Sequence, residues 1–253
     1  GKGLKVGLQF TPQATGVFGA MGPNTVADAA LGLHEGYSRV QGQYLRVYAG
    51  RFELNYGDAF IIGNLDWHEL GRSFDGARAR FSSSPTSAWI DLFVTMVDEV
   101  RDPALTVAAA KGLGIGKGDL YFYGAYAALG PALMPNFDLD LYALAQGYHK
   151  TPGLKVDASD PMSPTYTREA ATHVTLGARV KQKIKILDYR AEVGLQKGSR
   201  PGAAPQVMPN VTPATKQAAV DVSAYQVDAE VGLNLIQDKL RVAAEGMYAS
   251  GDD

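Results

Sequence analysis

The chain contains no cysteine among its 253 residues, and this absence excludes several kinds of site. A disulfide framework, a cysteine-based metal site and a thiol nucleophile all need this residue. Histidine is scarce as well, and its four positions, His34, His68, His149 and His173, lack the spacing of metal ligands. We therefore expect no metal, no cofactor and no enzymatic activity.

Long apolar runs are also missing, although 46% of the residues are hydrophobic. Runs such as Phe60 to Ile62 fall far short of the roughly 18 residues that a membrane-spanning helix needs. The 24 Lys and Arg residues do not exceed the 26 Asp and Glu residues, so a nucleic-acid partner is not expected. The first residues carry no apolar segment or cleavage site of a secretory signal. If the protein is exported, we expect its signal to lie outside this sequence.

What the chain does have is alternation with a period of two residues. In Leu187 to Gln196 one face is Leu, Tyr, Ala, Val and Leu, and the other is Asp, Arg, Glu, Gly and Gln. Tyr225 to Leu235 repeats the pattern, and so do Val174 to Lys181 and Ala77 to Phe81. A period of two indicates β-strands with one apolar face.

The pattern predicts about eleven strands. These are Leu4–Thr11, Ala30–Gln41, Leu45–Tyr56, Ala77–Ser82, Trp89–Val97, Leu120–Leu129, Phe137–His149, His173–Gln182, Ile186–Lys197, Val222–Leu235 and Leu240–Ser250. The connections between them alternate between short and long. The long connections are about Val17–Ala27, Asp58–Asp75, Glu99–Gly118, Thr151–Ala171 and Ser199–Ala219.

Spanning strands with short turns at one end and long loops at the other are typical of outer-membrane β-barrels. We therefore predict an all-β fold, an antiparallel transmembrane β-barrel formed as a single domain over residues 1–253. The alternative is a soluble β-sandwich or lipocalin-like barrel with its apolar face inward, but five long loops are unusual for such a domain. Single-chain barrels usually have an even strand number, so we expect a domain incomplete at both ends, part of a barrel of about 16–18 strands.

The segment Gly50-Arg51-Phe52-Glu53-Leu54-Asn55-Tyr56-Gly57-Asp58, followed by Gly63-Asn64-Leu65-Asp66-Trp67 and Gly71-Arg72-Ser73-Phe74-Asp75-Gly76, resembles the signature of the alginate-export family of outer-membrane barrels. The resemblance implies a Gram-negative outer membrane and a lumen that passes an acidic polysaccharide or a related solute. It implies the lipid bilayer as a partner, and it leaves open contacts with periplasmic secretion or envelope-complex proteins.

Six charged residues and one tryptophan of this segment form a candidate rim cluster of a long loop. Its members are Arg51, Glu53, Asp58, Asp66, Trp67, Arg72 and Asp75. Their pairing could fold the loop inward over a pore. We favour the alternative that they are structural ion pairs and turn-formers around a small core of Trp67 and Phe74, since loop ordering alone explains these residue types.

If the apolar faces meet lipid, the opposite faces line the lumen and set its selectivity. The predicted pore-lining residues are Arg78, Arg80, Asp91, Arg179, Lys181, Arg190, Glu192, Asp228, Glu230 and Arg241. Arg78, Arg80, Arg179 and Arg190 are the candidates for binding carboxylates of an anionic polymer, because guanidinium groups match carboxylate geometry. The signs are mixed, however, so these residues could instead neutralise one another. A channel is the leading function, and a barrel that anchors or docks a protein complex without transport is the alternative.

Overall fold

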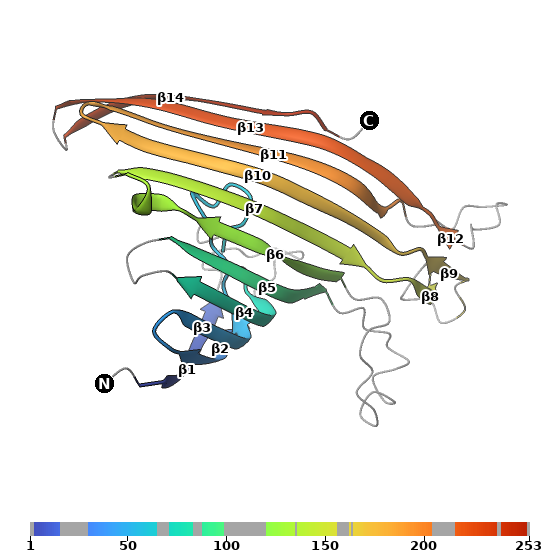
Figure 1. Ribbon diagram of the computed structural model, residues 1–253. Coiled ribbons are helices and arrows are strands. Elements are labelled where there is room, and N and C mark those ends of the chain that lie inside the picture. Colours follow the sequence, from blue (N-terminus) through green and yellow to red (C-terminus); the bar gives the residue numbers. More distant parts are fainter. Residues whose placement is uncertain are drawn as a thin grey trace, which may run out of the picture.

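The computed structural model describes residues 3–15, 30–64, 71–82, 88–98, 120–134, 136–155, 162, 164–203, 216–236 and 239–251 (Figure 1). Eleven antiparallel strands form one sheet in which the spatial order is the order along the chain. These strands are β1 (Lys5–Thr15), β2 (Ala30–Gln41), β3 (Leu45–Phe52), β4 (Phe74–Ser82), β5 (Trp89–Asp98), β6 (Leu120–Ala128), β7 (Phe137–Tyr148), β10 (Ala171–Ile184), β11 (Leu187–Pro201), β13 (Ala219–Ile236) and β14 (Leu240–Ala249). The all-β prediction is confirmed, and each predicted strand has a counterpart.

A second sheet lies beyond the ends of the main strands. Its strands are β8 (Thr151–Lys155), β9 (Thr165–Arg168) and β12 (Lys216–Gln217). β8 pairs with β9 antiparallel, and β12 pairs with β9 in parallel. These residues lie in two of the long connections predicted from the sequence, so the prediction of irregular loops is wrong for this part. A short 3₁₀ helix, η2 (Gly130–Ala132), lies in the turn between β6 and β7.

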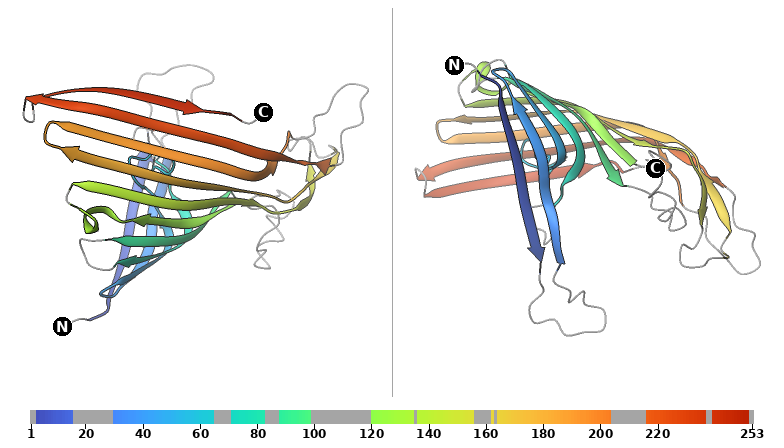
Figure 2. Two further views of the ribbon diagram at one scale, coloured as in Figure 1. Left: turned by 45° about the horizontal axis from the view of Figure 1, so that its top comes forward. Right: turned by 90° about the horizontal axis from the view of Figure 1, so that it is seen from below.

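The main sheet bends steadily from β1 to β14, so that it has a convex and a concave face (Figures 1 and 2). Because consecutive strands are antiparallel neighbours, the short turns lie at one end of the sheet and the long connections at the other. Among the described residues, no helix has the length and apolar character needed to cross a bilayer. β1 and β14 form the two edges and are not paired with each other in the described part of the chain.

Apolar side chains occupy the convex face and stay exposed there. One row runs across six strands in register, from Leu92 through Ala125, Ala143, Leu176 and Leu195 to Tyr225. Leu176 is 54% exposed and Leu195 is 59% exposed. In a soluble sheet, such residues would be covered by a second layer. No described residues form a layer over this face.

The buried core lies on the concave face instead. It consists of Tyr48, Phe52, Leu54, Tyr56, Ile62, Phe74, Phe93, Phe122, Tyr126, Tyr142 and Leu144. Three of these, Leu54, Tyr56 and Ile62, belong to the connection between β3 and β4 rather than to a strand. The predicted strand Leu45–Tyr56 is therefore too long. β3 ends at Phe52, and the chain then leaves the sheet and packs over its concave face.

Candidate functional site

The site is built around residues 53–64, which we call the inward loop. The loop leaves β3, and its apolar side chains Leu54 and Tyr56 are buried to 0% and 5% exposure against the concave face. The ring of Tyr56 stacks on that of Tyr126 of β6, with centroids 4.3 Å apart. Figure 1 shows the loop as a light-blue tube that passes behind β7. Burial of these apolar side chains holds the loop against the sheet.

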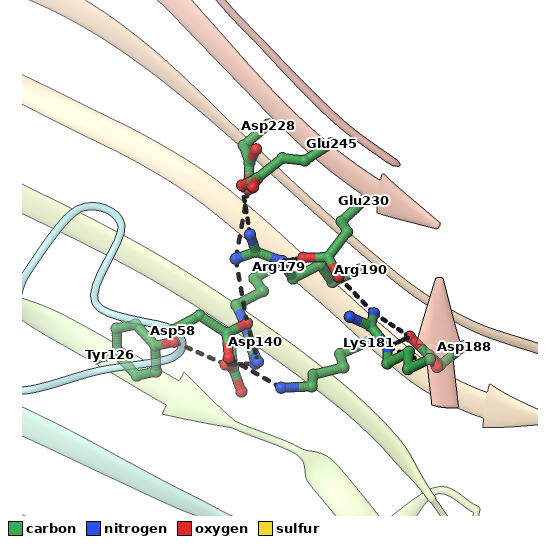
Figure 3. Close-up of polar contacts among 11 residues, drawn as sticks. Asp58, Tyr126, Asp140, Arg179, Lys181, Asp188, Arg190, Asp228, Glu230 and Glu245 are labelled. Atoms are coloured by element: carbon green, nitrogen blue, oxygen red, sulfur yellow. Dashed lines mark hydrogen bonds and ion pairs between the residues drawn. The ribbon is translucent and has the colours of Figure 1, made fainter. Parts of the chain in front are cut away.

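The tip of the inward loop reaches β10, five strands away from β3. The carboxylate of Asp58 accepts hydrogen bonds from Nε (2.9 Å) and Nη2 (2.6 Å) of Arg179, and from Nζ of Lys181 (2.9 Å) (Figure 3). Nη1 of Arg190 on β11 lies 3.9 Å from the same carboxylate. Burial alone would raise the pKa of Asp58, but hydrogen bonds from Lys181 and Arg179 outweigh it and lower the pKa. Asp58 therefore stays ionised.

Gly57 permits this close approach. Its φ of 58° lies in the left-handed region, which disfavours residues with a Cβ. A Cβ at this position would lie 2.9 Å from Cδ of Arg179 and 3.1 Å from the hydroxyl oxygen of Tyr126. A larger residue would push the tip away from β10.

Polar contacts fix the two ends of the loop. Glu53 contacts Nε2 of His34 on β2 at 2.5 Å and accepts a hydrogen bond from Nδ2 of Asn64 at 2.8 Å. Arg51 and Asp75, which face each other on β3 and β4, form a bidentate pair with distances of 2.8 and 2.7 Å. These contacts order the loop, as the structural interpretation of the rim cluster expected.

The remaining members of the predicted rim cluster have different surroundings. The backbone N–H of Arg72 donates to Asn64 O at 2.6 Å, while the residue itself lines a cavity next to the loop. Phe74 begins β4 and is buried in the core. Asp66 and Trp67 lie outside the described residues. The loop is therefore held by ion pairs, as the structural interpretation expected, and it extends over the concave face of the sheet.

The predicted pore-lining residues share the concave face, and most of them form cross-strand ion pairs. Arg80 donates from Nε (2.6 Å) and Nη2 (2.7 Å) to the fully buried Asp91. Arg179 binds Asp140 of β7 through Nη1 at 2.8 Å, in addition to Asp58. Directly opposite strand neighbours of unlike charge stabilise a sheet.

The network continues across β11, β13 and β14 (Figure 3). Arg190 donates from Nε to Glu230 at 2.8 Å and lies 3.5 Å from Asp228. It also pairs with Glu245, and Arg241 pairs with Glu230 and Asp188. Neutralisation of Arg190 by Asp228 and Glu230 is therefore present, as one of the two sequence-based interpretations expected.

Three arginines of the concave face lack a carboxylate partner among the described residues: Arg39, Arg46 and Arg78. Arg39 and Arg78 flank Tyr48 in register, and the guanidinium of Arg78 lies 4.2 Å from the centroid of the Tyr48 ring. Arg46 faces Arg80 on β4. β2, β3 and β4 therefore have positive charge without carboxylate partners among the described residues, whereas Arg179 of β10 and Arg190 of β11 are paired with carboxylates.

Three tyrosines join this network, although the sequence pattern did not single them out. The hydroxyls of Tyr56, Tyr126 and Tyr142 donate to Asp91 (2.9 Å), Asp140 (2.7 Å) and Glu192 (3.0 Å). Each tyrosine therefore connects the aromatic core to the ionic network. The alternation of β7 contains a signal for this, because Tyr142 lies two residues after Asp140 and so shares its face. The sequence of one strand does not predict which carboxylate on another strand accepts the hydrogen bond.

Two cavities lie on opposite sides of the inward loop. Towards the long connections there is one of about 460 Å³, which is lined by Ile61, Ile62, Arg72, Ser73, Phe74, Val97, Phe122, Leu144, Ala145, Gln146, His173, Thr175 and Gln196. Towards the short turns there is one of about 750 Å³, which is lined by Asp58, Asn136, Asp138, Lys181, Gln182, Lys183, Asp188, Tyr189, Arg190, Glu230, Asn234 and Arg241. The loop separates a mixed apolar cavity from a strongly charged one.

Comparison with known proteins does not identify a family for this chain. No family model matches the chain, and no curated protein matches it at a significant level.

Proposed function

We propose that this chain forms the wall of an outer-membrane β-barrel channel that passes an anionic solute, with an acidic polysaccharide as the cargo that the sequence resemblance implies. One observation carries the proposal. The sheet exposes a continuous apolar surface on its convex side, while its concave side has the charges, the cavities and a loop folded inward. This polarity suits a wall with lipid outside and water inside.

The backbone supports the same proposal. A sheet in hydrocarbon must have every strand edge paired, because an unpaired backbone group there costs several kcal/mol. The proposal therefore requires partners for the outer edges of β1 and β14. The regular up-and-down order of the eleven strands suits closure of this kind, since each strand already pairs with its neighbours in sequence.

Free positive charge on β2, β3 and β4 supports an anionic solute. Arg39, Arg46 and Arg78 carry guanidinium groups without carboxylate partners in the described part of the chain, so they remain available for carboxylates of the solute. Arg80, Arg179 and Arg190 belonged to the sequence-based prediction for this task. Their charges are offset by Asp91, by Asp58 with Asp140, and by Glu230 with Asp228.

The experiment is planar-bilayer conductance of the full chain, with the reversal potential measured across a salt gradient. We expect discrete channels with anion preference, and we expect replacement of Arg39, Arg46 and Arg78 by glutamate to reverse that preference. A matched control replaces Lys185, Lys197 and Lys239, which line neither cavity, by glutamate, with the same change in net charge. Absence of channels refutes the channel, and unchanged selectivity in the arginine variant refutes the role of these arginines.

A second candidate is a non-transporting barrel that anchors or docks a surface or periplasmic protein complex. The small sheet of β8, β9 and β12 favours it, because this sheet joins two long connections into one ordered structure beyond the strand ends. Replacement of residues 151–168 by a short glycine-serine linker should abolish binding of such a partner and leave conductance intact. If conductance is lost as well, the small sheet belongs to the channel itself.

A further inference from the structure

The ion pairs of Asp58 differ from the other ion pairs of the concave face in the structural elements that they connect. The arginine and lysine belong to the wall, on β10, whereas the carboxylate belongs to the inward loop. The other pairs in the network of Figure 3 join one strand to its neighbour or to the next strand but one. Breaking the Asp58 contact therefore separates the loop tip from the wall without unpairing any strand.

The tip depends on this one carboxylate for its polar attachment to the wall. Residues 57–59 are exposed, unlike Tyr56 before them. Ala59 adopts a φ of 61°, a left-handed conformation that is unfavourable for a residue with a Cβ. Among the described residues, Asp58 is the tip residue whose side chain bonds to β10. A competing anion at Arg179 and Lys181 would thus release the tip from β10, while Tyr56 next to the tip stays packed on Tyr126.

Two of the three cations that Asp58 contacts have surface that a solute can reach, Lys181 and Arg190, whereas the side chain of Arg179 is only 6% exposed while Asp58 is bound to it. Lys181 keeps 47% of its side chain exposed, and Asp58 is its ion-pair partner in the described part of the chain. Asp58, Lys181 and Arg190 all line the charged cavity of about 750 Å³. Nε and Nη2 of Arg179, together with Nζ of Lys181, already present donors in the geometry that a carboxylate needs.

We propose that Arg179, Lys181 and Arg190 form a carboxylate-binding site that Asp58 occupies as an internal ligand, and that a carboxylate of the solute displaces it. Displacement frees the tip of the inward loop and widens the path between the two cavities. The solute is thus both the cargo and the signal that opens its own route. This inference rests on the proposed channel function and adds its regulation.

The test measures single-channel open probability of the full chain in planar bilayers, with trigalacturonate as the anionic probe and maltotriose as the neutral one. In the wild type, trigalacturonate should raise the open probability in a saturable way, and maltotriose should not. Asp58→Asn should raise the open-to-closed ratio about tenfold without probe, because hydrogen bonds to a charged group are lost. Trigalacturonate should then have no further effect on gating.

Three further variants keep the outcome interpretable. Glu169→Gln removes a carboxylate that pairs with Lys150 and Lys216, away from the inward loop, and should leave gating unchanged. Asp58→Glu should restore the wild-type response. Lys181→Met keeps the contact of Asp58 with Arg179 and should raise the trigalacturonate concentration needed for half-maximal opening, so it tests the site even if Asp58→Asn fails to fold.

The results separate this inference from the proposed function. If the wild type forms no channel, the proposed function fails and this inference fails with it. If the wild type conducts but Asp58→Asn gates like the wild type, the channel stands and the internal-ligand role is refuted. Equal effects of trigalacturonate and maltotriose would also refute it, because the site would then not recognise a carboxylate.

Discussion

Gly177 on β10 provides the sharpest test of how the concave face is packed. A Cβ there would lie 2.2 Å from Cζ, 2.3 Å from the hydroxyl oxygen and 2.4 Å from Cε2 of Tyr142. The tyrosine ring therefore lies directly over this glycine, and it crosses β10 to reach Glu192 on β11. Gly177→Ala must displace the ring.

Two contributions determine how far Gly177→Ala lowers the free energy of unfolding. Forcing a methyl group into a packed site costs about 1–3 kcal/mol. Moving the ring also removes the hydrogen bond from the Tyr142 hydroxyl to Glu192, whose carboxylate is buried to 7% exposure, and this costs about 1–3 kcal/mol more. The two contributions together lower the free energy of unfolding. Because the substitution also restricts the unfolded chain slightly, which offsets part of this loss, we expect a decrease of about 2–5 kcal/mol for Gly177→Ala.

The assay is equilibrium urea unfolding from lipid vesicles, followed by tryptophan fluorescence. Gly246→Ala on β14 is the matched control, because a Cβ there meets no atom within 4 Å, and we expect a change below about 1 kcal/mol. In a Tyr142→Ala background, Gly177→Ala should cost less than about 1 kcal/mol. If Gly177→Ala costs the same in both backgrounds, the overlap with the ring is not the cause.

Three further predictions concern lipid contact, pH and an exposed ion pair. Leu176→Lys on the convex face should lower the free energy of unfolding from vesicles by about 2–4 kcal/mol, whereas Ala243→Lys on the concave face should change it little; equal effects would contradict the lipid-facing assignment. Because the pKa of Asp58 is lowered on folding, its attachment is fully present above the usual aspartate pKa and is lost as the pH falls through the lowered value. The open probability should therefore rise on acidification in the wild type and stay flat in Asp58→Asn, and a parallel rise in both would refute this. Gly232→Ala would place a Cβ 2.5 Å from Nη2 of Arg241 and disturb its pairs with Asp188 and Glu230, and we expect the urea unfolding midpoint to stay close to that of the wild type; a clear shift would mean that these pairs are not solvent-screened.

The pH prediction depends on all the charged groups around Asp58. Arg179, Lys181 and Arg190 face it from β10 and β11 and favour its ionised form. Asp140 shares Arg179 with it, and Glu192 lies close enough for like-charge repulsion with Asp58. Protonation of Asp58 removes one of these negative charges and weakens the attachment of the tip.

Sequence patterning was sufficient for the strands of the main sheet because their signal is local. Alternation within Leu187–Pro201, for example, identifies both the strand and its charged face without reference to any other segment. It failed for β8, β9 and β12, where β12 has two residues and pairs in parallel with a strand far away in the chain. Short strands of this kind carry too few residues for a period to show.

The inward loop marks the point at which local information ends. From the sequence alone came the strands, the separation of apolar and charged faces, and the charged character of residues 51–58. The sequence did not decide whether the loop folds inward or is only ordered by its own ion pairs, since residue types do not specify the partners of each side chain. The tertiary structure decided that Asp58 meets Arg179, 121 residues later in the chain. It also decided which arginines are neutralised, because curvature and register place strands opposite one another, and these depend on the whole sheet rather than on any one segment.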